Sequence, residues 1–298
     1  MKRVVSVSLG SASRDHQATL TLLGETIQIE RCGTEGDLSR ARSLIRDLDG
    51  TVDAIGLGGI DRYLIVNQRR YEIQDALQLV QAASQTPVVD GSGIKDTLER
   101  TLIQELHENR IIHPSESVLM VSAMDRFGMA ETFYRLGYSL VAGDLIFSSH
   151  INYPIRTADE LEELARKLLP ELAKMPFQQL YPVGSAQTEE SDSRYAGYFD
   201  QADIIAGDFH YIRRYMPKNL QGKLIITNTT TRQDVELLKS SGARLLVTTT
   251  PILDGRSYGT NVMEAALLAI SGLSAEDARW TEWVKKTGLR GSIQELKG

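Results

Sequence analysis

The stretch that decides the fold runs from Val118 to Asp144 and reads VLMVSAMDRFGMAETFYRLGYSLVAGD. A short apolar run is followed by a turn, a helical segment, a second turn and a second apolar run that closes on Asp144. This order is typical of a βαβ unit that binds a dinucleotide. In such a unit, glycines let the backbone approach a pyrophosphate, a helix N-terminus faces that anion, and an acidic residue accepts hydrogen bonds from the ribose.

The turn of this unit keeps only part of the expected glycine pattern. When Ala123 to Gly128 is aligned with G-x-G-x-x-G, Gly128 alone matches a glycine. Asp144, 21 residues after Ala123, has the spacing of the ribose-binding acid, and its charge would favour NAD over NADP. Asp125 would repel a pyrophosphate unless Arg126 offsets its charge. We therefore take Ala123, Arg126, Gly128 and Asp144 as candidate cofactor-binding residues, with a nucleotide-free α/β core as the alternative.

Beyond Pro114 the sequence alternates short apolar runs with helical segments, which predicts a parallel sheet covered on both faces. Ligands of such sheets bind outside the carboxyl ends of the strands. Asn228, Thr249 and Thr250 follow two of these runs and add an amide and two hydroxyls to the predicted cofactor site. The five predicted strands are Val118–Val121, Leu140–Ala142, Ile204–Ala206, Leu224–Ile226 and Leu245–Val247.

Residues 1–113 are predicted to form a mixed α/β substrate domain. Their patterns predict two hairpins, Ala18–Glu30 and Tyr63–Ile73, among strands and helices. The predicted strands are Val4–Leu9, Asp53–Gly59 and Pro87–Val89, and the predicted helices include Leu38–Leu48 and Ile94–Glu108.

Residues 114–258 are predicted to form a Rossmann-like domain with a helical insertion around 150–200, and residues 259–298 to form C-terminal helices that return toward the first domain. In the insertion, Thr157–Lys174 is an amphipathic helix that Pro170 should end or kink, and it would serve as a lid, a dimer surface or simple packing. Gly184–Arg194 is polar enough for a mobile loop. The segment Asn261–Ser271 is apolar nearly all round, which indicates a buried helix between the domains.

Composition narrows the function classes. The 298 residues are 42% hydrophobic and have a net charge of −6, which is globular and leaves no excess of positive charge for nucleic acid. No apolar run is long enough to span a membrane, and serines interrupt the run that resembles a signal peptide. Cys32 is the only cysteine, so the cytoplasm fits best and a cysteine zinc site is excluded. The five histidines lack the paired spacing of a metal-binding helix, so we expect no metal.

Lys95 is the candidate catalytic residue of the first domain. It follows Asp90-Gly91-Ser92-Gly93 near the start of a predicted helix, where the macrodipole should lower its affinity for protons. The alternative is a solvated lysine paired with Asp96 or Glu99.

Seven phrases spread over most of the chain resemble a bacterial family commonly labelled quinate 5-dehydrogenase. The resemblance implies a relative of shikimate and quinate dehydrogenases, with a substrate domain, a nicotinamide-binding domain and a returning helix. It also implies that Lys95 acts on the reacting hydroxyl with an aspartate as its partner. Asp90 or Asp61 could be that aspartate by position, and we take Asp90 as the candidate. The resemblance further implies that the loop Thr249-Thr250-Pro251 lies near the nicotinamide. The phrases are VSVSLGSASRDH, DAIGLGGIDRY, VVDGSGIKDTLER, VSAMDRFGMAE, IIAGDFHYIRRYMP, GKLIITNTTT and LLVTTTPILDGRSYGTNVMEA.

The leading hypothesis is an NAD-dependent oxidoreductase acting on a cyclic polyhydroxy acid such as quinate or shikimate in an interdomain cleft. One alternative is a non-redox enzyme, a transferase or lyase that holds a phosphorylated or carboxylated metabolite through Arg126, Arg213 and Arg214. Another is a nonenzymatic Rossmann-like ligand sensor. All three predict a small-molecule acid or nucleotide as the partner, and a homodimer is compatible with each.

Overall fold

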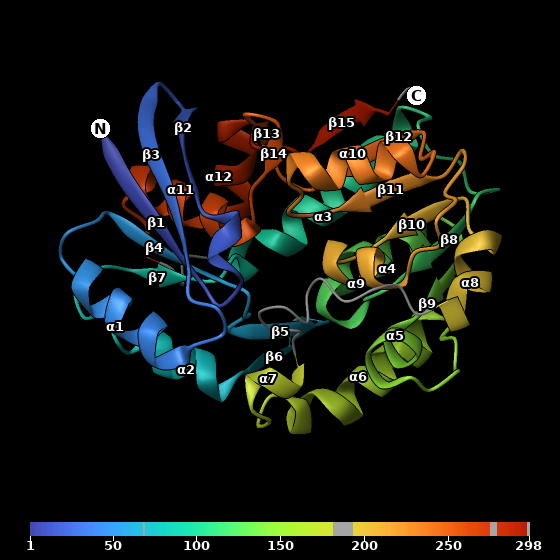
Figure 1. The fold of residues 1–298 in the computed structure, drawn as a ribbon, viewed down its shortest axis with the longest axis horizontal. Coiled ribbons are helices and arrows are strands. Elements are labelled where there is room, and N and C mark those ends of the chain that lie inside the picture. Colours follow the sequence, from blue (N-terminus) through green and yellow to red (C-terminus); the bar gives the residue numbers. More distant parts are fainter. Residues whose placement is uncertain (68, 181–192, 275–278, 297–298) are drawn as a thin grey trace.

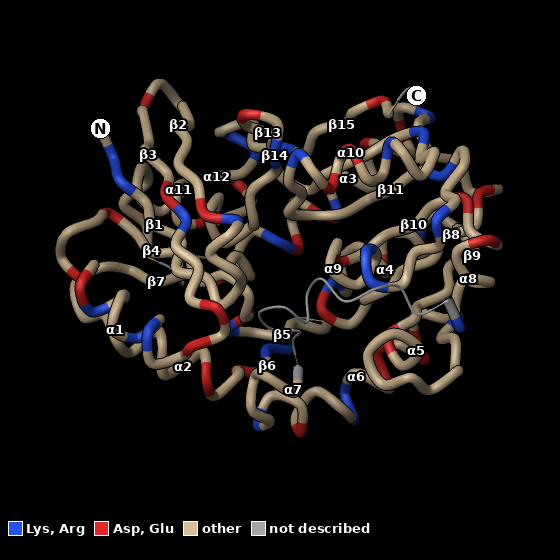
Figure 2. The backbone as a smooth tube through the Cα atoms, viewed as in Figure 1, with Lys and Arg blue, Asp and Glu red and all other residues tan. Residues whose placement is uncertain are grey.

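The chain folds into two α/β lobes that lie side by side, each built on its own sheet (Figure 1). The computed structural model describes residues 1–67, 69–180, 193–274 and 279–296. The expected fold class, mixed α/β with largely parallel sheets, is confirmed. Figure 2 shows that acidic and basic residues are interspersed over both lobes.

The first lobe is built on a five-stranded sheet with the strand order β2-β3-β1-β4-β7. β1 pairs in parallel with β3 and β4, β4 pairs in parallel with β7, and β2 forms an antiparallel hairpin with β3. Gly24 in that hairpin turn has φ +82°, a conformation that favours glycine. The strands are β1 (Lys2–Ser8), β2 (His16–Leu22), β3 (Glu25–Gly33), β4 (Ala54–Gly58) and β7 (Val88–Val89).

The helices of this lobe follow the predicted pattern closely. α1 (Leu38–Leu48) begins after Asp37, whose side chain accepts a hydrogen bond from the backbone N–H of Arg40. α2 (Gln74–Val80) follows a small hairpin of β5 (Tyr63–Val66) and β6 (Arg69–Glu72). α3 (Ser92–Glu108) begins two residues earlier than the periodicity predicts.

The second lobe contains a six-stranded sheet with the strand order β15-β12-β11-β10-β8-β9. Its four parallel pairings join the five predicted strands, and β15 adds an antiparallel edge that the sequence did not reveal. The strands are β8 (Ser117–Met120), β9 (Ser139–Ala142), β10 (Ile204–Ala206), β11 (Leu224–Thr227), β12 (Leu245–Thr248) and β15 (Ser292–Glu295). The helices are α4 (Phe127–Arg135), α5 (Asp144–Ser149), α8 (Ala196–Gln201), α9 (Phe209–Tyr215) and α10 (Arg232–Ser240).

The predicted insertion connects the two lobes. α6 (Ala158–Leu172) ends two residues after Pro170, and α7 (Phe177–Leu180) follows it. Asn67, in the β5–β6 turn, donates a hydrogen bond to Glu162 at 2.9 Å, and Asp75 accepts one from the backbone N–H of Phe177 at 2.9 Å. The packing interpretation of this helix therefore has direct support. Most of the loop predicted at Gly184–Arg194 lies outside the described residues.

The chain returns to the first lobe through α11 (Thr260–Ser271), which packs against β1 and β4, and α12 (Trp280–Thr287), which packs against α3. α11 has buried side chains around its circumference, as predicted. One apolar cluster joins both lobes and includes Val5 of the first sheet and Val118 of the second. A short hairpin of β13 (Ile252–Leu253) and β14 (Arg256–Ser257) precedes α11.

Gly56 in β4 is predicted to be intolerant of a side chain, because a Cβ there would lie 2.8 Å from the backbone oxygen of Asn261 in α11. We expect Gly56→Ala to lower the free energy of unfolding by about 1–3 kcal/mol through overpacking. Gly197→Ala is the matched control, since a Cβ at Gly197 meets nothing within 4 Å. Urea denaturation of both variants measures the difference, and equal stability of the two would contradict the close packing of α11 on β4.

Candidate functional site

A cavity of about 290 Å³ lies between the lobes, where the carboxyl ends of both parallel sheets meet. The first lobe contributes the ends of β1 and β4 and the loop that contains Asp61. The second contributes the loops after β8, β10 and β11, which include Ser122, Asp208 and Asn228. Polar side chains from segments far apart in sequence therefore face one space, as is usual for ligand sites in α/β proteins.

Lys95 lies in the cavity wall between two carboxylates. Its Nζ is 3.4 Å from Oδ2 of Asp125 and 3.7 Å from Oδ2 of Asp61. Burial alone would lower the pKa of Lys95, but the two carboxylates outweigh burial and hold the pKa above its ordinary value. The expected lowering by the helix macrodipole is therefore wrong. Lys95 remains a protonated donor and a fixed positive charge at neutral pH.

The structure does not pair Asp90 with Lys95. One carboxylate oxygen of Asp90 accepts hydrogen bonds from the backbone N–H groups of Arg62 and Tyr63, and the other accepts from Ser92. Asp90 thus organises the loop that presents Asp61 and the start of α3. Among the described residues, the ion-pair partners of Lys95 are Asp61 and Asp125.

Asp144 occupies the backbone amides of the turn that was predicted to hold a pyrophosphate. Its Oδ1 accepts hydrogen bonds from the N–H groups of Ala123 at 2.9 Å and Met124 at 2.8 Å. Burial raises the pKa of Asp144 to about 7, although these two amides act to lower it. Because its carboxylate is turned to the protein backbone, the residues of this turn do not fit a dinucleotide in the expected way.

Gly128 has a packing role at the start of α4. A Cβ there would lie 2.1 Å from Oδ1 of Asp96 in α3, so the glycine permits α3 and α4 to approach closely. Gly128, expected among the cofactor-binding residues, thus faces side chains of α3.

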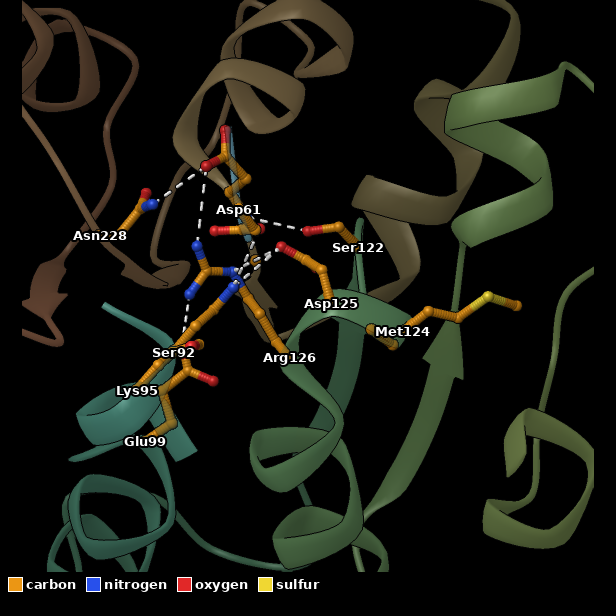
Figure 3. A network of polar contacts seen from close by, with 12 residues as sticks. Asp61, Ser92, Lys95, Glu99, Ser122, Met124, Asp125, Arg126 and Asn228 are labelled. Carbon is orange, nitrogen blue, oxygen red and sulfur yellow. Dashed lines mark hydrogen bonds and ion pairs between the residues drawn. The ribbon is translucent and has the colours of Figure 1, made fainter. Parts of the chain in front are cut away.

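Arg126 is committed to a buried charge network (Figure 3). Its guanidinium forms an ion pair with Glu99, and the two side chains are 3% and 1% exposed. Nη2 also lies 3.7 Å from Asp208, and Nε lies 3.9 Å from Asp125. Arg126 is therefore directed at protein carboxylates, which leaves it poorly placed to neutralise a pyrophosphate.

The remaining predicted cofactor residues divide into two groups. Asn228 lines the cavity and donates a hydrogen bond to Asp208 at 3.0 Å. Thr249 and Thr250 are fully buried outside the cavity wall, and the hydroxyl of Thr250 donates to the carbonyl oxygen of Tyr258. The structure thus brings Asn228 to the site and leaves the two threonines in the core.

Arg14 and His210 form a contact between the lobes that the sequence did not reveal. Nη1 of Arg14 donates to Nε2 of His210 at 2.8 Å, and Nη2 donates to the carbonyl oxygen of Thr229 at 3.2 Å. Both residues follow the ends of predicted strands, and this position was the sequence feature that could have marked them as site residues. Only the folded chain shows that their side chains meet.

The arginines of the transferase alternative do not converge on one ligand. Arg213 pairs with Asp234 at 3.0 Å, and Arg214 stacks over the ring of Tyr215. Among the described residues there is no cluster of side chains suited to a metal ion. None of the helices that the structure describes combines the length and apolar character needed to cross a membrane.

The fold and the cavity define a two-lobed α/β protein with a polar cleft between its lobes. The chain belongs to the family described as "Domain of unknown function (DUF8754)", whose model matches residues 93–296. A second model, "Domain of unknown function (DUF8753)", matches residues 3–90. No curated protein matches this sequence.

Solved structures with some likeness to the chain include binding proteins and an enzyme. A galactofuranose binding protein has 12% identity and a TM-score of 0.36, with 97% of this chain and 99% of that chain covered. A glucose-galactose binding protein from Geobacillus stearothermophilus has 10% identity and a TM-score of 0.39, with 99% and 97% covered. A putative malic enzyme has 13% identity and a TM-score of 0.34, with 97% and 85% covered. These scores are too low to support an argument about function.

The raised pKa of Asp144 predicts a specific dependence of stability on pH. Since its pKa is about 7 in the folded chain and about 3.9 when unfolded, the native state binds the extra proton between these values. The free energy of unfolding should therefore fall as pH rises from about 4 to about 7, and the Asp144 contribution should then level off.

We expect Asp144→Asn to reduce this fall by roughly 2–4 kcal/mol, because the amide oxygen still accepts from the turn and does not ionise. A residual slope should remain from Glu264, whose pKa burial raises to about 8. Urea denaturation between pH 4 and pH 7 is the measurement, with Glu264→Gln as the parallel variant. An unchanged slope in Asp144→Asn would contradict the burial of an ionisable carboxyl at this turn.

Proposed function

We propose that the chain binds a small polyhydroxylated molecule in the cleft between its lobes, and that ligand binding rather than dinucleotide-dependent oxidation is its function. The observation that carries the proposal is the cluster of Lys95, Asp61 and Asp125 on the cavity wall. Oδ1 of Asp125 is buried and has no hydrogen-bond partner among the described residues. A buried acceptor without a donor is costly, and a ligand hydroxyl would supply that donor.

The donors and acceptors of the cluster match the hydroxyl groups of a polyol. A hydroxyl both donates and accepts hydrogen bonds, so it needs an acceptor and a donor close together. Carboxylates supply the acceptors, while the ammonium of Lys95 supplies donors on the same wall. Asn228 and Asn261 add amides to the lining of the cavity. Such a site orients a hydroxylated ring through several directional contacts.

Oxidation of a quinate-like or shikimate-like acid is the second candidate. It is favoured by the position of Lys95, which lies beside two carboxylates in the cleft, as a lysine acting on a reacting hydroxyl would. Because the pKa of Lys95 is raised, the residue suits orientation of a ligand oxygen better than removal of its proton. Asp144 occupies the turn amides, so this candidate also requires a dinucleotide to bind elsewhere.

Thermal unfolding with a panel of ligands tests the proposal. We expect at least one of quinate, shikimate, glucose and galactose to stabilise the protein, by about 2.7 kcal/mol at roughly 100 times its Kd. NAD and NADP should leave the unfolding temperature unchanged. Stabilisation by NAD with no response to any polyol would support the oxidoreductase candidate and contradict the proposal of polyol binding.

Asp125→Asn tests the role of the cluster, because it removes the charge beside Lys95 at nearly constant volume. We expect the affinity for the stabilising polyol to fall about tenfold or more, as for the loss of a charge-assisted hydrogen bond. Asp96→Asn is the matched control, since Asp96 pairs with Arg100 and does not line the cavity. Isothermal titration calorimetry measures both affinities, and equal effects of the two variants would contradict the assignment.

A further inference from the structure

A second cavity of about 730 Å³ adjoins the cleft and is rich in arginine. Arg14, His16, His210 and Tyr258 line both cavities, so the two spaces share a wall. The second cavity is lined by four arginines and two carboxylates, in a chain whose net charge is −6. Its arginines are Arg14, Arg213, Arg232 and Arg256, and its carboxylates are Glu35 and Asp254.

Arg256 presents an unused edge of its guanidinium in this wall. Its Nη1 donates a hydrogen bond to the carbonyl oxygen of Arg14 at 3.1 Å. Its Nε and Nη2 are buried and have no hydrogen-bond partner among the described residues. These two N–H groups form one side of the planar fork, the side that matches two oxygens of a carboxylate or phosphate.

His16 and Tyr258 add two further open polar atoms to the same place. Nδ1 of His16 donates to the carbonyl oxygen of Arg14 at 2.8 Å, the same oxygen that accepts from Arg256. The ring of His16 lies 4.7 Å from the ring of Tyr258. Nε2 of His16 and the hydroxyl of Tyr258 are both buried without a partner in the described part of the chain.

The surrounding charges also favour an anion. Burial, together with repulsion from Arg14 and Arg256, lowers the pKa of Arg31 to about 10 although Asp15 acts to raise it. Arg31 has a carboxylate partner, Asp15, at 2.6 Å, whereas the described residues provide no ion pair to Arg14 or Arg256. Asp234 and Asp208 attract Arg14 only from beyond ion-pair distance, and Asp234 attracts Arg256 in the same way. A bound anion would therefore relieve the mutual repulsion of the three guanidinium groups.

We propose that Arg256, together with Tyr258, binds an oxyanion, either a carboxylate or a phosphate group, of the ligand whose hydroxyls bind near Lys95, while Nε2 of His16 is left to accept from a ligand hydroxyl. This inference rests on the proposed function and narrows its ligand to an acidic polyol, such as a sugar acid or a sugar phosphate. Arg256 lines the second cavity, and its two unpartnered N–H groups lie on one edge of the guanidinium. The oxyanion then receives the Nε and Nη2 protons and the hydroxyl proton of Tyr258.

Calorimetry with three probes tests the site: quinate as an acidic polyol, myo-inositol as a neutral polyol, and inorganic phosphate as an anion alone. We expect Arg256→Gln to weaken quinate and phosphate about tenfold or more, while myo-inositol changes by less than about twofold. Arg256→Lys should restore only part of the affinity, because lysine keeps the charge and lacks the fork. Phosphate should compete with quinate in the wild-type protein.

Arg232→Gln is the matched control. It removes the same charge from the same cavity, but Nε and Nη2 of Arg232 already donate to the carbonyl oxygen of Asp254. If Arg232→Gln weakens quinate as much as Arg256→Gln, binding depends on general charge and the proposed site is wrong. Tyr258→Phe, which should weaken quinate severalfold, replaces Arg256→Gln if that variant does not fold, and an unchanged affinity then overturns the site.

The two proposals fail in different ways. If myo-inositol binds and Arg256→Gln leaves quinate unaffected, the oxyanion site is wrong and the polyol cleft stands. If phosphate binds in an Arg256-dependent manner and no polyol binds, the cleft proposal fails and an independent anion site remains. If neither quinate nor phosphate binds the wild-type protein, the oxyanion site is overturned.

Discussion

The ion pair between Arg126 and Glu99 is the contact on which the cleft depends. Glu99 comes from α3, which packs with the first lobe, and Arg126 comes from the turn after β8 in the second lobe. Both side chains are almost completely buried, so each charge needs the other to offset its loss of hydration. Removing one partner of such a pair typically costs about 3–5 kcal/mol, because the other charge is left buried alone.

This pair also determines how the neighbouring charges are arranged. Arg126 lies within 4 Å of Asp125 and Asp208, and Asp125 in turn faces Lys95. Asp125 and Asp208 are therefore held by protein cations, and Oδ1 of Asp125 is left without a partner among the described residues. On the opposite side, Arg14 and Arg256 have hydrogen bonds to neutral groups only. The acids near Lys95 and Arg126 therefore have cationic partners, whereas Arg14 and Arg256 have no carboxylate partner among the described residues.

Hydrophobic periodicity was sufficient to predict most of the fold. The strands of the second sheet and helices such as Leu38–Leu48 appear within one or two residues of their predicted limits, because their apolar residues are buried in a regular pattern. The edge strand Ser292–Glu295 was missed, since Ile293 is its only apolar residue and is exposed. Such a strand forms because β12 offers it an open edge, which is information that a short local sequence lacks.

The site was less predictable because its properties come from residues far apart in the chain. Lys95 was placed correctly at the start of a helix, but the local helix dipole gave the wrong direction for its pKa. Asp125, 30 residues later, and Asp61 decide that direction through direct charge contacts. For Asp144, the spacing identified the correct turn and could not reveal whether the carboxylate would face a ribose or the backbone.

The position of Asp144 determines what the turn after β8 needs from a ligand. The N–H groups at a turn before a helix need an acceptor, and in dinucleotide-binding proteins a phosphate oxygen supplies it. Here a protein carboxylate meets the same requirement from within, and it is buried too deeply to be displaced without cost. The demand for an external anion is therefore removed at this turn. It persists at Arg256, where the donors have no acceptor among the described residues.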